Sequence, residues 1–264
     1  MTISVFDLFA IGIGPSSSHT VGPMKAAASF VNNLHHQNDF KNVKRITIEL
    51  FGSLAFTGKG HGTDHAMLLG LLGELPHSVD PDSIKPRAEA IIAEGRLPLD
   101  QHHSIAFDYL NDFIFNFKEL LPQHTNGMRF KAYNAAQEVL LEEIYYSIGG
   151  GFIFKENDSS NTTQPVDVPY PFENAKTLIE LCEKHGLSIS ELMLQNESAL
   201  RSKEEVESRL LLIADVMRAC IEKGCRTKGT LPGGLNVKRR APDLYEKLLA
   251  RGKPASHEDR KSVV

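Results

Sequence analysis

The chain has 264 residues, of which 41% are hydrophobic and 23% are charged, and its formal net charge is −4. These values are close to globular averages, allow one large domain or two ordinary ones, and argue against a polyanion-binding protein. The first residues lack the basic and apolar regions of a signal peptide, and no stretch approaches the ~18 apolar residues of a membrane span. We therefore expect a cytoplasmic protein that binds neither nucleic acid nor membrane.

The first half of the chain alternates helix and strand patterns, recognised from helical spacing or from strict alternation of apolar residues. The predicted elements are a helix over 24–31, a strand over 45–50, helices over 63–72 and 81–94, and strands over 113–117, 130–133 and 139–148. Thr63 or Asp64 is expected to cap the second helix. Asn126-Gly127 is the strongest short hairpin signal, where left-handed backbone geometry normally explains an asparagine.

The second half of the chain is predicted to be helical only. Helices are expected over 174–185 with Gly186 closing it, from Ser190 onward, from the capping-box pattern at 202–205 to Lys223, and over 242–251. The fold class is therefore α+β: an N-terminal mixed α/β-sandwich-type domain over 1–155, a linker over 156–170 and an all-helical segment over 171–264. Several apolar helix faces lack a clear partner, so we expect the helical segment to be incomplete.

The three cysteines, Cys182, Cys220 and Cys225, are odd in number and irregularly spaced. This pattern argues against a disulfide framework and is typical of ordinary buried thiols. The one basic cluster, at 238–240, is typical of a solvated loop or a patch beside a helix.

The most unusual stretch, 12–20, precedes a predicted helix N-terminus. Its hydroxyl and imidazole side chains are Ser16, Ser17, Ser18, His19 and Thr20. Free backbone N–H groups and a partial positive charge at such a place suit a carboxylate or a phosphate. A serine-rich turn with a single cap residue explains the pattern equally well. It is not a Walker loop, because no Gly-Lys-Ser/Thr follows.

The second candidate site is His61, which stands between Gly60 and Gly62. Flanking glycines allow close approach of the backbone to a ligand, and histidine is the usual general base near neutral pH. An exposed loop histidine is the alternative. Asn126 and Ser147 could each contact a ligand, although turn geometry or strand structure explains them as well.

Taken together, these stretches resemble the iron–sulfur, pyridoxal-independent L-serine dehydratases of bacteria. The matching segments, in the expected order, are 12–24, 58–61, 126–128, 145–152, 169–172 and 231–233. The resemblance implies a smaller β domain joined to a larger helical α domain, which binds a [4Fe-4S] cluster through cysteines. None of the three cysteines matches those ligands, which are expected C-terminal to residue 264, so a truncated or split enzyme is predicted.

The resemblance also implies the chemistry: elimination of water from L-serine, giving pyruvate and ammonia without pyridoxal phosphate. An open iron site would act as the Lewis acid, and a base would remove the Cα proton. We nominate His61 as that base and His19, with Ser16, Ser17, Ser18 and Thr20, for the substrate carboxylate or amine. Thr63 and Asn126 are weaker candidates for substrate contact, and Lys238 and Arg239 for a domain interface or an anion. The implied partners are L-serine, the remainder of the α domain or a separate α chain, and a second copy in a homodimer.

Two other classes of function remain open. An isolated chain could be a catalytically inactive regulatory module that binds serine or an anion. A phosphate-handling enzyme would need a P-loop lysine and an acidic Mg²⁺ set, neither of which has a recognisable spacing in this sequence.

Overall fold

The computed structural model describes residues 4–37, 40–157, 167–231 and 236–250. The chain divides into two compact units, residues 1–199 and 200–264. In the first unit the helices are α1 (Val5–Leu8), α2 (Gly22–His36), α3 (Gly52–Thr57), α4 (Thr63–Leu71), α5 (Ile84–Glu94), α6 (Tyr109–Asp112), α7 (Ala175–His185) and α8 (Ile189–Ser198). Its strands are β1 (Arg45–Phe51), β2 (Arg96–Leu99), β3 (His103–Ala106), β4 (Phe113–Asn116), β5 (Gly127–Tyr133), β6 (Val139–Gly149) and β7 (Phe152–Lys155).

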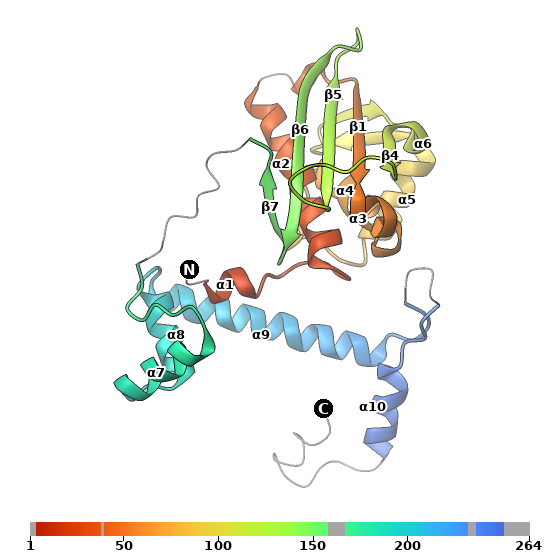
Figure 1. The fold of residues 1–264 in the computed structure, drawn as a ribbon. Coiled ribbons are helices and arrows are strands. Elements are labelled where there is room, and N and C mark those ends of the chain that lie inside the picture. The colour runs from red at the N-terminus through yellow and green to blue at the C-terminus, as the bar shows by residue number, and fades with distance from the viewer. Residues whose placement is uncertain (1–3, 38–39, 158–166, 232–235, 251–264) are drawn as a thin grey trace. The chain divides into compact units, whose positions relative to one another are not determined.

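A five-stranded sheet in the order β4-β1-β5-β6-β7 forms the centre of the first unit, and β2 and β3 pair separately (Figure 1). The β1–β4 pair is parallel, and the other pairs of this sheet are antiparallel. Alternation along β1 turns Ile46, Ile48 and Leu50 to one face, where they are fully buried. The predicted α+β class is confirmed.

The buried face of the sheet is covered by α2 and α4, which lie behind it in Figure 1. Phe30 of α2 stacks on Phe130 of β5 with ring centroids 5.1 Å apart. Gly70 of α4 lies against α2: a Cβ atom there would stand 2.4 Å from the Met24 carbonyl oxygen. This close approach brings the N-terminal ends of the two helices, and the turns that precede them, to the same side of the unit.

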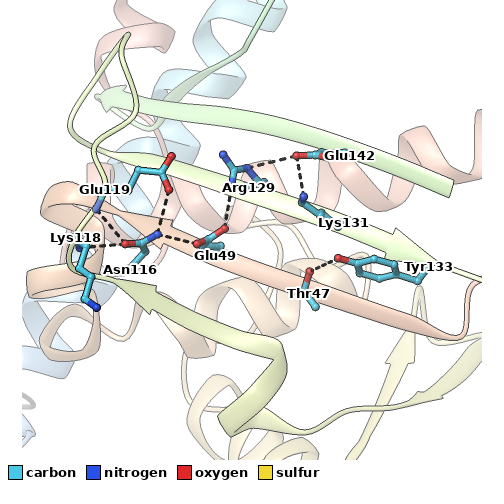
Figure 2. A network of polar contacts seen from close by, with 9 residues as sticks. All are labelled: Thr47, Glu49, Asn116, Lys118, Glu119, Arg129, Lys131, Tyr133 and Glu142. Carbon is cyan, nitrogen blue, oxygen red and sulfur yellow. Dashed lines mark hydrogen bonds and ion pairs between the residues drawn. The ribbon is translucent and has the colours of Figure 1, made fainter. Parts of the chain in front are cut away.

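The opposite face of the sheet carries a network of charged side chains (Figure 2). Glu49 on β1 accepts a hydrogen bond from Arg129 on β5 at 3.0 Å. Glu142 on β6 pairs with Lys131 at 3.2 Å and lies 3.5 Å from the Nε atom of Arg129. Cross-strand pairs of opposite charge stabilise a solvated sheet face. This face is therefore neutralised by its own residues.

The hairpin predicted at Asn126-Gly127 is wrong. Gly127 begins β5, and β1 lies between β4 and β5 in the sheet, so the connection from β4 to β5 is a crossover. Asn126 is buried, its side-chain amide donates to the Ser147 carbonyl at 3.0 Å, and it is not among the residues with positive φ. A long-range strand contact, and not turn geometry, accounts for this asparagine.

Helix ends differ from prediction at several places. The cap of α4 is Gly62, at φ 64°, because the Thr63 hydroxyl binds elsewhere. The helix α8 begins at Ile189, one residue before the predicted start at Ser190, and Ser188 caps it with a full capping box to Glu191. Gly186 closes α7 at φ 64° as predicted. The predicted linker falls largely on 158–166, outside the described residues, as do Pro232, Gly233 and Arg251.

The described part of the second unit consists of α9 (Lys203–Arg226), α10 (Ala241–Ala250) and an isolated bridge between Thr230 and Lys238. Ser202 caps α9 as predicted, but the helix continues through Gly224, because one glycine costs a helix of this length only ~1 kcal/mol. Cys182 in the first unit is buried, whereas Cys220 on α9 is exposed, so the expectation of buried thiols is wrong for Cys220. No helix of the described residues is both long and apolar enough to cross a membrane.

Candidate active site

His19 lies in a short π-helical turn, η1 (Ser17–Val21), that leads directly into α2. Its backbone N–H donates to the Ser16 hydroxyl at 3.2 Å. Both ring nitrogens face hydroxyls: Nδ1 lies 2.9 Å from Ser18 Oγ, and Nε2 lies 3.0 Å from Ser53 Oγ. The imidazole is therefore oriented from both sides by hydroxyls that can either donate or accept a hydrogen bond.

His61 ends a 3₁₀ turn, η3 (Gly58–His61), just before α4. Its Nδ1 lies 2.9 Å from the Thr57 carbonyl oxygen. A carbonyl only accepts hydrogen bonds, so Nδ1 carries the proton and Nε2 holds the lone pair in the neutral ring. This is the tautomer in which Nε2 can act as a base.

The two imidazoles lie together, with ring centroids 4.9 Å apart and planes tilted by 40°. Their backbones are tied reciprocally. Thr20 Oγ1, one residue after His19, donates to the His61 carbonyl at 3.1 Å. Thr63 Oγ1, two residues after His61, donates to the His19 carbonyl. Each threonine thus holds the other turn, which fixes the two histidines relative to each other.

Electrostatics favour an uncharged His19. Burial lowers the pKa of the His19 imidazole below its usual value, and the neighbouring His61 lowers it further, while a hydrogen bond with Ser53 acts in the opposite direction. Both leading causes act against the charged form, because burial removes hydration and a second imidazolium repels the first. At neutral pH the His19 imidazole is therefore uncharged.

Some of the other predicted site residues lie beside the two histidines and others do not. Ser16, Ser18, Thr20 and Thr63 all belong to the hydrogen-bonded cluster around the histidines. The Ser17 side chain is exposed at the start of η1.

Asn126 is connected to the histidine cluster only through its neighbour Thr125. The Thr125 carbonyl accepts a hydrogen bond from the Ser53 N–H at 2.9 Å. The Asn126 Oδ1 and Ser147 Oγ atoms are buried and have no hydrogen-bond partner among the residues that the structure describes. Lys238 lies in the other unit and pairs with Asp243 at 2.8 Å.

Two residues that orient the histidines, Ser53 and Thr57, were not predicted. Both belong to α3, which begins at Gly52 immediately after β1. Gly52 has φ 51°, a left-handed conformation that glycine adopts at little cost. A glycine directly after a strand, followed by a hydroxyl residue, is the sequence signal that could have identified this turn.

A hollow of about 260 Å³ on the charged sheet face contains neither histidine; it is lined by Arg45, Thr47, Glu49, Asn111, Ile114, Arg129, Lys131 and Tyr133. Its cations are paired with Asp112, Glu49 and Glu142. Within the described ranges, no three His, Cys, Asp or Glu side chains are grouped so that they could hold a metal ion. The histidine pair is therefore the best candidate for chemistry.

Residues 4–158, which include both histidines and the residues Ser18, Ser53 and Thr57 that hydrogen-bond to their rings, match the family model for the serine dehydratase beta chain. The chain belongs to the serine dehydratase family. Residues 184–262 also match the model for the serine dehydratase alpha chain. The resemblance drawn from the sequence motifs is thus confirmed at the level of the family.

Several curated members of the serine dehydratase family are similar to this chain. An L-serine dehydratase of Streptomyces coelicolor is 47% identical over 257 residues, covering 96% of this chain and 56% of the relative. L-serine dehydratase 2 of Escherichia coli is 48% identical over 254 residues, covering 95% of this chain and 55% of the relative. The chain therefore spans about half the length of the curated relatives it matches.

Proposed function

We propose that this chain supplies the substrate-binding and proton-transfer residues of an L-serine dehydratase, which eliminates water from L-serine to give pyruvate and ammonia. The observation that carries the proposal is the imidazole pair, whose ring centroids are 4.9 Å apart and in which His61 presents Nε2 with its lone pair. Relatives named L-serine dehydratase support serine as the substrate.

In the proposed reaction His61 Nε2 accepts the Cα proton of serine. The electrons of the broken Cα–H bond form the Cα=Cβ double bond, and the Cβ–O bond breaks with its electrons on oxygen. The proton accepted by His61 passes to the leaving hydroxide, which completes one molecule of water and restores the neutral imidazole. The resulting aminoacrylate becomes an imine, which water hydrolyses to pyruvate and ammonia. A positioned base of this kind typically contributes about 10²–10⁴-fold to the rate.

The His19 cluster is proposed to hold the serine carboxylate. It lies in the turn that leads directly into α2, a helix of fifteen residues whose dipole favours an anion at its N-terminal end. Ser16 and Ser18 already hydrogen-bond to the His19 backbone and ring. Since the pKa of His19 is lowered mainly by burial, the ring serves as a neutral hydrogen-bonding group beside the base.

The family resemblance also suggests a [4Fe-4S] cluster acting as a Lewis acid. The donor set of the described residues does not fit one, because Cys182 is buried in α7 while Cys220 and Cys225 lie on α9, and no group of three ligating side chains forms. No step of the proposed reaction is therefore assigned to a cluster.

The proposal is tested by replacing each histidine and measuring binding and turnover separately. In the complete enzyme, assayed anaerobically for pyruvate, His61→Ala should lower kcat by about 10²–10⁴-fold while serine still binds. His19→Ala should raise KM by roughly 10–100-fold, the value expected for losing a hydrogen bond to a charged group. His36→Ala, at the exposed end of α2, is the matched control.

Near-normal turnover by His61→Ala would refute its role as the base, and an unchanged KM for His19→Ala would refute the binding role. Calorimetry with L-serine on the isolated chain tests binding independently of turnover. Heat of binding that disappears in His19→Ala supports the proposed carboxylate site, and no serine binding by the wild-type chain contradicts it.

A further inference from the structure

The turn that carries His61 is held by a residue that the proposed reaction does not use. Tyr109, in α6, donates its hydroxyl to Asp64 Oδ2 at 2.5 Å. The Nζ atom of Lys59 lies 6.0 Å from the centroid of the same Tyr109 ring. Lys59 stands two residues before His61 and Asp64 three residues after it. One side chain from a distant part of the sequence therefore contacts the chain on both sides of the imidazole.

Asp64 is the fixed end of this contact. Its side chain is buried in the first turn of α4, where the helix dipole favours a carboxylate. Its Oδ1 atom accepts the His65 N–H at 2.9 Å, and its Oδ2 atom accepts the Tyr109 hydroxyl. A buried carboxylate needs such donors, since an unsatisfied one is strongly unfavourable. Breaking the Tyr109–Asp64 hydrogen bond would therefore leave a buried carboxylate oxygen without its donor, which keeps the two side chains together.

The segment between these anchors has little stiffness of its own. Gly58, Gly60 and Gly62 alternate with Lys59 and His61, and glycine restricts the backbone less than any other residue. A Cβ atom at Gly60 or Gly62 would meet nothing within 4 Å, so packing does not confine the turn at those points. The direction of the His61 ring thus depends on its own hydrogen bond to the Thr57 carbonyl and on the contacts made by the residues that flank it.

We propose that Tyr109, acting through Asp64 and Lys59, is a positioning residue for His61. The inference rests on the proposed function only in treating His61 as the base. Burial and the adjacent Asp64 carboxylate raise the pKa of Tyr109 well above its usual value, so the hydroxyl remains a donor at any pH where the enzyme would work. The ring face is turned to the Lys59 cation, an arrangement that is favourable by cation–π attraction.

Tyr109→Phe separates the two contacts, because it removes the hydroxyl and keeps the ring under Lys59. The readout is the tautomer of His61, taken from the nitrogen chemical shifts of histidine-labelled chain without serine. The wild type should show one fixed Nδ1–H tautomer, and Tyr109→Phe should show averaged shifts for the two nitrogens. In the complete enzyme kcat should fall by about 10–100-fold with KM little changed, as expected for a misplaced catalytic group.

Tyr133→Phe is the matched control. Tyr133 pairs with Arg45 at the opposite end of β1 from the His61 turn, and its hydroxyl lies 3.5 Å from Thr47. It should leave both the His61 tautomer and kcat unchanged. Asp64→Asn gives a second route: if Tyr109 acts through Asp64, the double variant should be no worse than Asp64→Asn alone.

A single fixed tautomer in a folded Tyr109→Phe chain, or additive losses in the double variant, would overturn the proposal. The tautomer measurement does not involve serine, so its result stands apart from the turnover of His61→Ala. Averaged shifts in Tyr109→Phe beside normal turnover in His61→Ala would support the positioning contact and refute the base. Fixed shifts in Tyr109→Phe beside lost turnover in His61→Ala would refute the positioning contact and support His61 as the base.

Discussion

Gly70→Ala should destabilise the first unit, although alanine is the better helix former. The added Cβ would lie 2.4 Å from the Met24 carbonyl oxygen and 2.8 Å from the Ala27 Cβ, both on α2. A backbone carbonyl cannot rotate away as a side chain can, so the two helices must separate. Overpacking of this kind costs about 1–3 kcal/mol, against a helix-propensity gain of ~1 kcal/mol.

The net loss should be up to about 2 kcal/mol, which lowers Tm by up to about 8 °C in a domain of this size. The chain has no tryptophan, and five of its six tyrosines lie within residues 1–199, so near-ultraviolet circular dichroism reports mainly on the first unit. Gly224→Ala is the control, since no described residue outside the backbone of α9 lies within 4 Å of the added Cβ. A Tm for Gly70→Ala equal to or above the wild-type value would refute the argument that the α2–α4 contact requires glycine.

The other predictions concern protonation and buried polar groups. Because the pKa of His19 is lowered below 6.5, mainly by burial and then by His61, the unfolded chain binds this proton more readily. Urea unfolding should therefore show stability that is present above about pH 6.5 and falls below it, less steeply in His19→Gln. Glu143→Ala, which loses bonds to Asn33, Tyr145 and Lys155, should destabilise by about 2–4 kcal/mol in the same assay, and Lys155→Met by less. Ser147→Ala removes a buried hydroxyl that has no partner in the described part of the chain, and it should change the free energy of unfolding by less than about 1 kcal/mol.

Sequence patterns predicted most of the large elements because these depend on local periodicity. The alternation over Arg45–Leu50 reports directly which side chains face the core, and β1 has that boundary to within one residue. Asn174 and Gly186 mark the ends of α7 because capping is a local hydrogen-bonding requirement. The strands β2, β3 and β7, of four residues each, were missed, whereas β4, which is equally short, was predicted.

The failures share a physical cause, which is that a distant partner outweighs a local preference. Asn126-Gly127 is a strong turn signal, yet pairing of β5 with β1 and β6 fixes the chain there as a strand end. Thr63 is a good helix cap, yet its hydroxyl donates to the His19 carbonyl, and Gly62 takes the cap position. The two residues of that bond are 44 positions apart, so patterns among neighbouring residues cannot predict it.

The same separation in sequence explains why the residues of the candidate site could be predicted but the distances between them could not. His19 and His61 were recognisable one at a time, as histidines in glycine- and serine-rich turns. Their proximity follows from the packing of α2 on α4, which aligns the turns that precede both helices, and from the two threonines that exchange hydrogen bonds between those turns. Because each threonine binds a backbone carbonyl of the opposite turn, these two bonds set the spacing of the turns, while hydrogen bonds to the imidazoles set the direction of each ring. A substrate that contacts both rings would thus bind between two parts of the chain that are already fixed, and little of its binding energy would be needed to order them.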